Sequence, residues 1–147
     1  MICFSLLAPG QVTCAAFSPD LSLLAVGDAN REVKVWDRSS WATRVSGKWV
    51  FHTTTVSCLS WDPTGLFVAS GSLDESIYVW NLEKPMKKRQ IKCGFSLSHS
   101  ICCNSPYLIL RWAAVAHKAG VSAVNYVNEA TLVTAGNDGC VATWNLA

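Results

Sequence analysis

The sequence predicts an all-β protein built from a repeated unit of four short antiparallel strands. Three similar phrases, "EVKVWD", "SIYVWN" and "CVATWN", contain Trp36, Trp80 and Trp144, and the first two tryptophans are 44 residues apart. Between turn signals, apolar and polar residues alternate over short runs rich in Val, Ala and aromatics, which is typical of strands. No long stretch shows a helical period. Four strands in this length are typical of one blade of a β-propeller.

The first predicted blade covers residues 11–51. Its phrase "QVTCAAFSPDLSLLAVGDANREVKVWD" contains three alternating apolar runs, separated by a Pro-Asp turn signal and by a bend that contains glycine. The segment "ATRVSGKWVF" (42–51) predicts a fourth strand. Residues 1–10 precede the repeat, and there we expect a leftover strand or the start of a truncated chain.

The second predicted blade covers residues 52–92. Its phrase "TVSCLSWDPTGLFVASGSLDESIYVWN" aligns with the first phrase without a gap, and "MKKRQIK" (86–92) predicts its fourth strand. The third blade, residues 116–147, aligns with one deletion and lacks its outer strand. Because propellers close with typically four to eight blades, the sequence predicts a partial β-propeller of about three blades in an incomplete ring.

Residues 93–115 interrupt the repeat. The second and third tryptophans are 64 residues apart, and the excess equals the 20 residues of "CGFSLSHSICCNSPYLILRW". This segment is rich in Leu, Ile, Cys and Trp, whereas loops favour Gly, Asp and Asn. We predict an atypical insertion that arose from a retained intron or a gene-model artefact. A genuine insertion in a surface loop, and a metal-binding or membrane element, are the alternatives.

The composition narrows the class of protein. The chain has the 147 residues of one domain, half of them apolar, and a formal net charge of +2, which argues against nucleic-acid binding. Seven cysteines without a framework of spacings favour a reducing compartment. The first apolar run lacks the basic residue that precedes it in a secretory signal, and no apolar stretch is long enough to span a bilayer. We therefore predict a cytoplasmic protein without nucleic-acid, membrane or small-molecule partners.

The three phrases resemble the WD-repeat family over about residues 10–92 and 116–147. In that family a loop His, a strand Ser, a loop Asp and a Trp form a hydrogen-bonded chain that locks each blade. The resemblance implies that role for four residues of the second blade, which are His52, Ser70, Asp74 and Trp80.

The other two blades depart from this pattern. The third blade has His117, Asp138 and Trp144, with Ala135 at the position expected for the serine. The first blade retains little besides Trp36, because Val26 and Asn30 occupy the Ser and Asp positions.

A closer resemblance is to the last blades of the actin-interacting protein 1 family. It depends on "SGSLD", "YVWNLEKPMK" and "VSAVNYVNEATLVTAGNDG". Members of that family are two linked propellers that help cofilin to take actin filaments apart. The resemblance implies actin and cofilin as partners, a cytoskeletal location, and a chain that matches only the end of the second propeller. A generic WD-repeat scaffold for another assembly, or a non-functional truncated fragment, remains the alternative.

The Ser, His and Asp of one repeat also raise the hypothesis of a hydrolase. Nucleophilic catalysis needs a His that takes the proton of Ser and an Asp that orients the His. A nucleophile need occur only once, whereas a structural lock recurs with each blade and includes Trp. We therefore expect no catalytic residue, no enzyme activity and no cofactor.

The remaining candidates are cysteines and basic residues. His99, Cys102 and Cys103 form the only plausible ligand cluster, but adjacent cysteines point in opposite directions in an extended chain, so we expect no metal site. Cys14 and Cys58 occupy equivalent strand positions and predict packing. The run "KPMKKR" is a candidate patch for an acidic partner such as an actin surface, or else a solvated edge strand, and its basic residues are Lys84, Lys87, Lys88 and Arg89.

Overall fold

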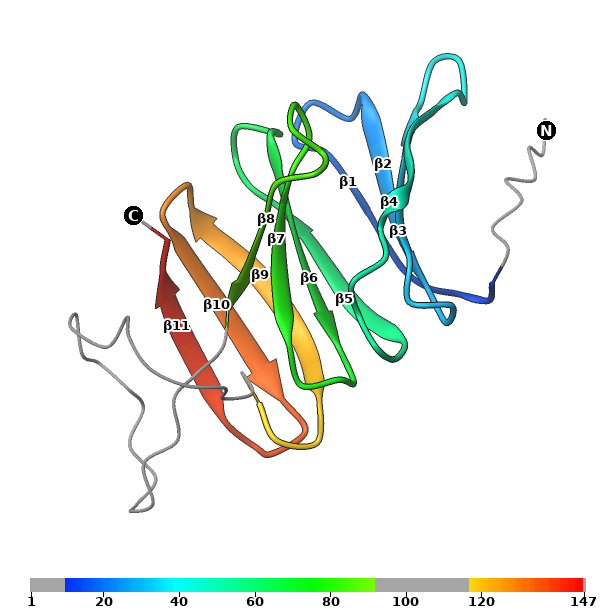
Figure 1. The fold of residues 1–147 in the computed structure, drawn as a ribbon. Helices are drawn as coiled ribbons and strands as arrows, with labels where there is room; N and C mark the ends of the chain where they lie inside the picture. The colour runs from blue at the N-terminus through cyan, green and yellow to red at the C-terminus, as the bar shows by residue number, and fades with distance from the viewer. Residues whose placement is uncertain (1–9, 92–116, 147) are drawn as a thin grey trace, which may run out of the picture.

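The computed structural model describes residues 10–91 and 117–146, which form eleven strands in three antiparallel sheets. The sheets stand side by side in chain order, each twisted, and do not close into a ring (Figure 1). The described residues contain no helix, so the prediction of an all-β, partial propeller is confirmed. The predicted insertion, 93–115, lies outside the described residues, as does nearly all of 1–10.

The first sheet contains β1 (Val12–Phe17), β2 (Leu23–Asp28), β3 (Val33–Asp37) and β4 (Thr43–Trp49), in that spatial order. The alternation of apolar and polar residues explains why these segments form strands, because every second side chain of a strand faces the neighbouring sheet. The Pro-Asp signal forms the turn between β1 and β2, where Asp20 Oδ1 accepts hydrogen bonds from the Ser18 hydroxyl and the Ser22 N–H.

The second sheet repeats this arrangement with β5 (Val56–Trp61), β6 (Phe67–Ser72), β7 (Ile77–Asn81) and β8 (Lys88–Ile91). Its first turn is fixed by a buried carboxylate, since Asp62 Oδ1 accepts the Phe67 N–H at 2.8 Å. The turn also needs a left-handed residue, and Gly65 has a φ of 73° there. The fourth strands expected in 42–51 and 86–92 are therefore present as β4 and β8.

The third sheet contains β9 (Val121–Asn128), β10 (Thr131–Gly136) and β11 (Val141–Asn145), in the order β11-β10-β9. These are the three strands that the described residues contribute to this sheet. The turn between β9 and β10 is shorter than the equivalent turn between β5 and β6, which locates the single deletion of the third repeat.

Two apolar cores lie between successive sheets. The core between the first two sheets includes Trp49 and Trp80, whose rings stack with centroids 5.3 Å apart. The inner strands β1, β5 and β9 approach closely: the Thr13 hydroxyl donates to the Val56 carbonyl, and the Ser57 hydroxyl to the Val121 carbonyl. This contact leaves no room for a side chain at two glycines of the repeat. A Cβ on Gly27 or Gly71 would lie 2.6 Å from a valine methyl of the next sheet.

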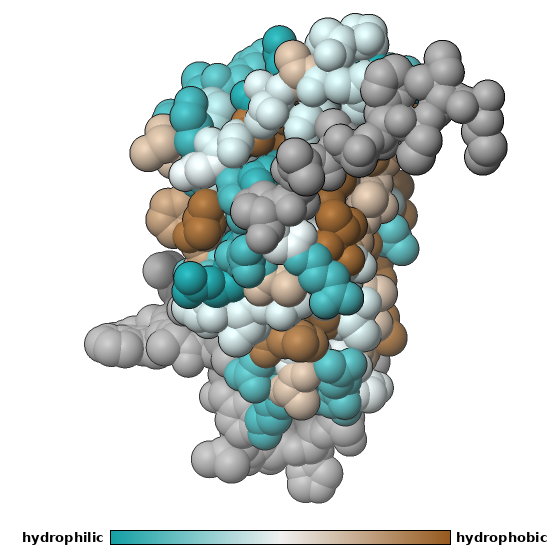
Figure 2. All heavy atoms as spheres, turned by 90° about the vertical axis from the view of Figure 1, so that its right-hand side faces the viewer, coloured by the Kyte–Doolittle hydropathy of each residue, from teal (hydrophilic) through white to brown (hydrophobic). Residues whose placement is uncertain are grey.

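Apolar side chains also remain exposed at the outside of the stack. Figure 2 views the side on which the first sheet lies, and brown apolar patches are separated there by teal polar residues. On β1, Val12 and Phe17 are 51% and 48% exposed, and on the third sheet Val127 and Val141 are also exposed. Among the described residues, no helix is long and apolar enough to cross a membrane.

Candidate functional site

A hydrogen-bonded chain joins the four residues singled out in the second repeat. His52 lies just before β5, Ser70 on β6, Trp80 on β7, and Asp74 in the turn between β6 and β7. His52 Nδ1 is 3.0 Å from Asp74 Oδ2, and His52 Nε2 is 2.8 Å from Ser70 Oγ. The Trp80 indole N–H donates to the same Ser70 oxygen at 2.8 Å. The structure thus brings all four together.

The chemistry of these groups fixes the direction of each hydrogen bond. A carboxylate only accepts, so Nδ1 of His52 carries the proton that Asp74 receives. In that tautomer Nε2 accepts from the Ser70 hydroxyl, whose oxygen accepts from Trp80. Every polar group of the chain therefore has a partner although His52, Ser70 and Trp80 are buried.

The third sheet contains the same chain, with a threonine that the sequence comparison did not identify. His117 Nδ1 is 3.1 Å from Asp138 Oδ1, and His117 Nε2 is 2.8 Å from Thr134 Oγ1. The Trp144 indole N–H donates to Thr134 Oγ1 at 2.8 Å. The assignment of Ala135 to the serine position was wrong.

The strand register explains this correction. Ser70 pairs with the residue two before Trp80, and Thr134 pairs with the residue two before Trp144. The deletion lies in the turn ahead of β10, so every residue after that turn shifts by one position. A sequence comparison that places the deletion in that turn would have found Thr134.

The first sheet lacks the chain. Trp36 pairs with Leu24, which is the register position that Trp80 and Trp144 occupy in their own sheets. Val26 lies at the serine position, as expected, and offers no hydroxyl to the indole. Trp36 is nevertheless buried.

The Ser70–His52–Asp74 arrangement matches a catalytic triad in its distances but not in its access. Ser70 is 0% exposed, so a substrate carbonyl cannot approach its oxygen in this structure. One lone pair of that oxygen is already occupied by the Trp80 indole. The geometry supports a structural role for the serine better than a nucleophilic one.

The carboxylate of each chain is held in its charged form. Burial opposes the ionisation of Asp74, but hydrogen bonds from His52, the Ser76 hydroxyl and the Thr53 N–H outweigh it and lower the pKa well below its usual range. In the third sheet, burial likewise opposes the ionisation of Asp138. Hydrogen bonds from the Cys140 N–H, His117 and the Lys118 N–H lower its pKa.

These shifts predict acid-sensitive stability. Because the pKa of Asp74 is lower in the folded state, the unfolded chain binds protons first as the pH falls. Its contribution is complete above the ordinary value of 3.8 and is lost as the pH falls through the folded pKa. In urea unfolding at pH 5 and pH 3, we expect Asp74→Asn to lose less stability between the two pH values than the unchanged protein. Glu83→Gln, a charge removal on an exposed side chain, should keep the full loss; equal losses in all three proteins would contradict this assignment.

The basic run lies beside the third sheet. Arg89 on β8 and Lys87 just before it line a pocket there, and Lys88 also borders this pocket while its ammonium lies over the Phe51 ring. Lys84 lies in the preceding turn, where its N–H donates to Asn81 Oδ1 at 2.8 Å.

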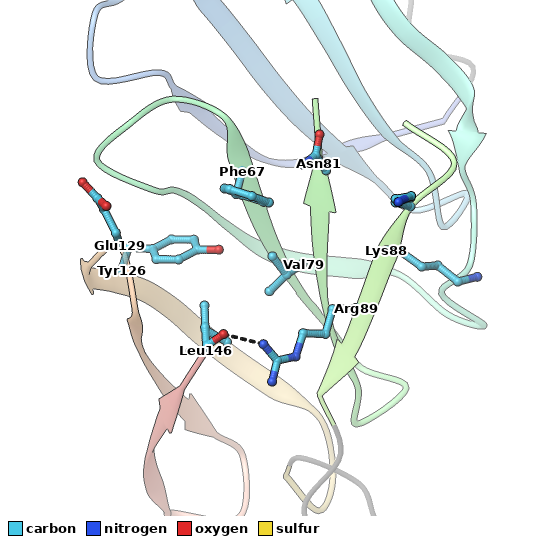
Figure 3. Close-up of a pocket in the computed structure, with 9 residues that line it drawn as sticks. Phe67, Val79, Asn81, Lys88, Arg89, Tyr126, Glu129 and Leu146 are labelled. Atoms are coloured by element: carbon cyan, nitrogen blue, oxygen red, sulfur yellow. Dashed lines mark hydrogen bonds between the residues drawn. The ribbon is translucent and has the colours of Figure 1, made fainter. Parts of the chain in front are cut away.

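Lys87 and Arg89 border a pocket of about 440 Å³ between the second and third sheets. Phe67, Val79 and the Tyr126 ring form its walls, and Leu146 closes one side (Figure 3). The Arg89 guanidinium donates to the Leu146 carbonyl at 2.5 Å, which fixes the arginine at the rim. Sequence reasoning found the two cations but not the apolar walls, because Phe67, Tyr126 and Leu146 come from three separate segments.

The cysteines in the described part of the chain show no arrangement for metal binding. Among residues 10–91 and 117–146, no three potential ligands lie close enough to hold an ion. His99, Cys102 and Cys103 lie outside the described residues. Cys14 and Cys58 pack beside glycines of the adjoining strand, and burial raises the pKa of Cys58 to about 11, so its reactive thiolate is disfavoured at neutral pH.

Comparisons with known proteins give the relatives of this chain. The family model described as "WD domain, G-beta repeat" matches residues 3–37 and 44–81. The chain is similar to the 66 kDa stress protein of Physarum polycephalum, with 34% identity over 93% of this chain. It is similar to actin-interacting protein 1 of Caenorhabditis elegans, with 30% identity over 94% of this chain. It spans only 19% and 20% of the lengths of these relatives.

The fold is also found in solved structures. The Cps50 (Swd1) beta-propeller domain of Myceliophteria thermophila is similar with a TM-score of 0.68 and 17% sequence identity. The match covers 96% of this chain and 37% of that chain. The three sheets are therefore arranged as successive blades of a β-propeller.

Proposed function

Because this chain belongs to the WD-repeat family, we propose that it is a protein-interaction module that binds actin and cofilin and promotes the cofilin-dependent disassembly of actin filaments. The observation that carries the proposal is the 30% identity to an actin-interacting protein 1 over 94% of this chain. The proposed mechanism is surface contact by shape and charge, with no bond made or broken. Its proposed location is the cytoplasm, at the actin cytoskeleton.

The structure offers surface chemistry that suits such a role. Lys84, Lys87 and Arg89 are exposed, and none of them has an ion-pair partner within the described part of the chain. Unpaired cations on one region attract an acidic partner and increase its rate of association. We propose that this region of the second sheet faces the partner. The hydrogen-bonded chains of the second and third sheets hold the supporting strands in place.

Co-sedimentation with actin filaments tests the proposal. The purified chain is mixed with filaments, with and without cofilin, and actin is measured in pellet and supernatant. We expect more actin in the supernatant when the chain and cofilin are both present than with cofilin alone. Actin release that is the same with and without the chain would contradict the proposal and favour a scaffold for a different assembly.

A charge reversal locates the contact. Lys84→Glu and Lys87→Glu together should reduce the release of actin, because two attractive charges become repulsive. The matched control is Arg44→Glu with Lys48→Glu on the exposed side of β4, the outer strand of the first sheet. An equal loss of activity in both double variants would place the contact elsewhere.

A further inference from the structure

We propose that the pocket between the second and third sheets binds an acidic peptide segment of a partner protein, with one large apolar side chain inserted between the sheets. This inference rests on the proposed role as an interaction module, but it does not require that the partner be actin. It depends on three features of the pocket, which are its apolar walls, an unpaired hydroxyl and a basic rim.

The walls define the place of the apolar side chain. Val79 on β7 belongs to the core between the two sheets, and Tyr126 on β9 and Leu146 are partly buried and pack against that core. Phe67, at the start of β6, remains 36% exposed beside them. The volume of about 440 Å³ is in the range of clefts that bind ligands, roughly 300–1,000 Å³. A peptide side chain that entered here would cover apolar surface on both sheets.

The hydroxyl of Tyr126 is a polar group without a partner. Its oxygen is buried and makes no hydrogen bond with the described residues. Figure 3 shows the hydroxyl pointing from the third sheet across the pocket toward Val79. Burial, and then the charge of Asp62, raise the pKa of this phenol, so it stays protonated and able to donate. A carbonyl or carboxylate oxygen of a bound peptide would supply the acceptor once the side chains that bury this hydroxyl have moved aside.

The rim determines the charge of the peptide. Lys87, just before β8, and Arg89, within it, line the pocket together with Lys88, and Glu129 is the acidic residue of the lining. Neither Lys87 nor Arg89 has an ion-pair partner among the described residues. Carboxylates on either side of the inserted apolar residue would therefore meet unpaired positive charge, which favours an acidic segment over a basic one.

Fluorescence anisotropy with a labelled peptide tests the proposal on the full chain. The probe is fluorescein-DEEFED, and its controls are DEESED, which lacks the apolar side chain, and NQQFQN, which lacks the charges. We expect saturable binding of DEEFED that weakens as salt is added, because exposed charges are screened over about 8 Å at physiological ionic strength. Both control peptides should bind at least about fivefold more weakly.

Two variants assign the binding to this pocket. Lys87→Glu should weaken DEEFED binding about fivefold or more, whereas Lys48→Glu on β4 should leave it unchanged. Tyr126→Phe should weaken binding about fivefold, since one hydrogen bond is lost. The same variant should match or exceed the unchanged protein in thermal stability, because it removes a buried hydroxyl that has no partner. If Tyr126 had only a structural role, Tyr126→Phe would instead lower the thermal stability of the protein.

The outcomes separate this inference from the proposed function. No saturable binding of DEEFED, or binding that Lys87→Glu and Tyr126→Phe leave intact, overturns the pocket assignment even when actin is released in the sedimentation assay. Peptide binding with the expected variant effects, together with unchanged actin release, supports the pocket and overturns actin as the partner.

Discussion

Replacing Trp80 by alanine is expected to lower the free energy of unfolding by about 3–5 kcal/mol, because a large buried ring is lost and a cavity remains. Trp80 is 0% exposed and contacts four other rings: it stacks on Trp49, is tilted against Phe51 and Tyr78, and meets His52 edge-on. Its indole N–H also ends the hydrogen-bonded chain at Ser70. The ring therefore joins the first sheet to the second and completes the polar chain of its own sheet.

Urea unfolding followed by circular dichroism measures this loss. The free energy of unfolding of Trp80→Phe should lie between those of Trp80→Ala and the unchanged protein, since a phenyl ring keeps part of the stacking on Trp49 but not the hydrogen bond. Val50→Ala is the control, because Val50 is 41% exposed and its truncation should change stability by less than about 0.5 kcal/mol. A Trp80→Ala protein as stable as Val50→Ala would refute the proposed structural role of this tryptophan.

Replacing Ser70 by alanine is expected to cost about 2–4 kcal/mol, although only one oxygen atom is removed. His52 Nε2 and the Trp80 N–H would both lose their partner inside the protein, and each unpaired buried group costs about 1–3 kcal/mol. The hydrolase hypothesis predicts the reverse, with unchanged stability and lost turnover of an ester such as p-nitrophenyl acetate. We expect no ester turnover that depends on Ser70.

Thr134 provides a matched test of the same chain in the third sheet. Thr134→Val keeps the volume of the side chain but removes the hydroxyl that bonds His117 and Trp144. Thr134→Ser keeps the hydroxyl but loses a methyl group. We expect the valine variant to be the less stable of the two in the same urea assay. The opposite order would show that packing, rather than hydrogen bonding, determines the stability at this position.

The basic strand β8 shows how much of a candidate binding site can be predicted from a run of residues in the sequence. The run of Lys and Arg was visible in the sequence, and two interpretations were open, a binding patch or a solvated edge. In the structure Lys87, Lys88 and Arg89 all border the pocket, and the Lys88 ammonium lies over the Phe51 ring. The pocket combines this positive charge with apolar walls and a buried hydroxyl, and this combination carries the proposal of a peptide site.

The sequence by itself determined the repeat, the all-β class and the strands, because alternation and turn residues act within a few positions along the chain. Through its resemblance to the WD-repeat family, the sequence also pointed to His52, Ser70, Asp74 and Trp80 as a hydrogen-bonded set. Only the tertiary structure decided that Thr134, and not Ala135, completes the chain in the third sheet. The pocket around Tyr126 likewise could not be predicted from the sequence. Both features depend on the register between strands and on the contact between sheets. Register and contact are determined by the packing of segments that are distant in the sequence, and local periodicity contains no information about them.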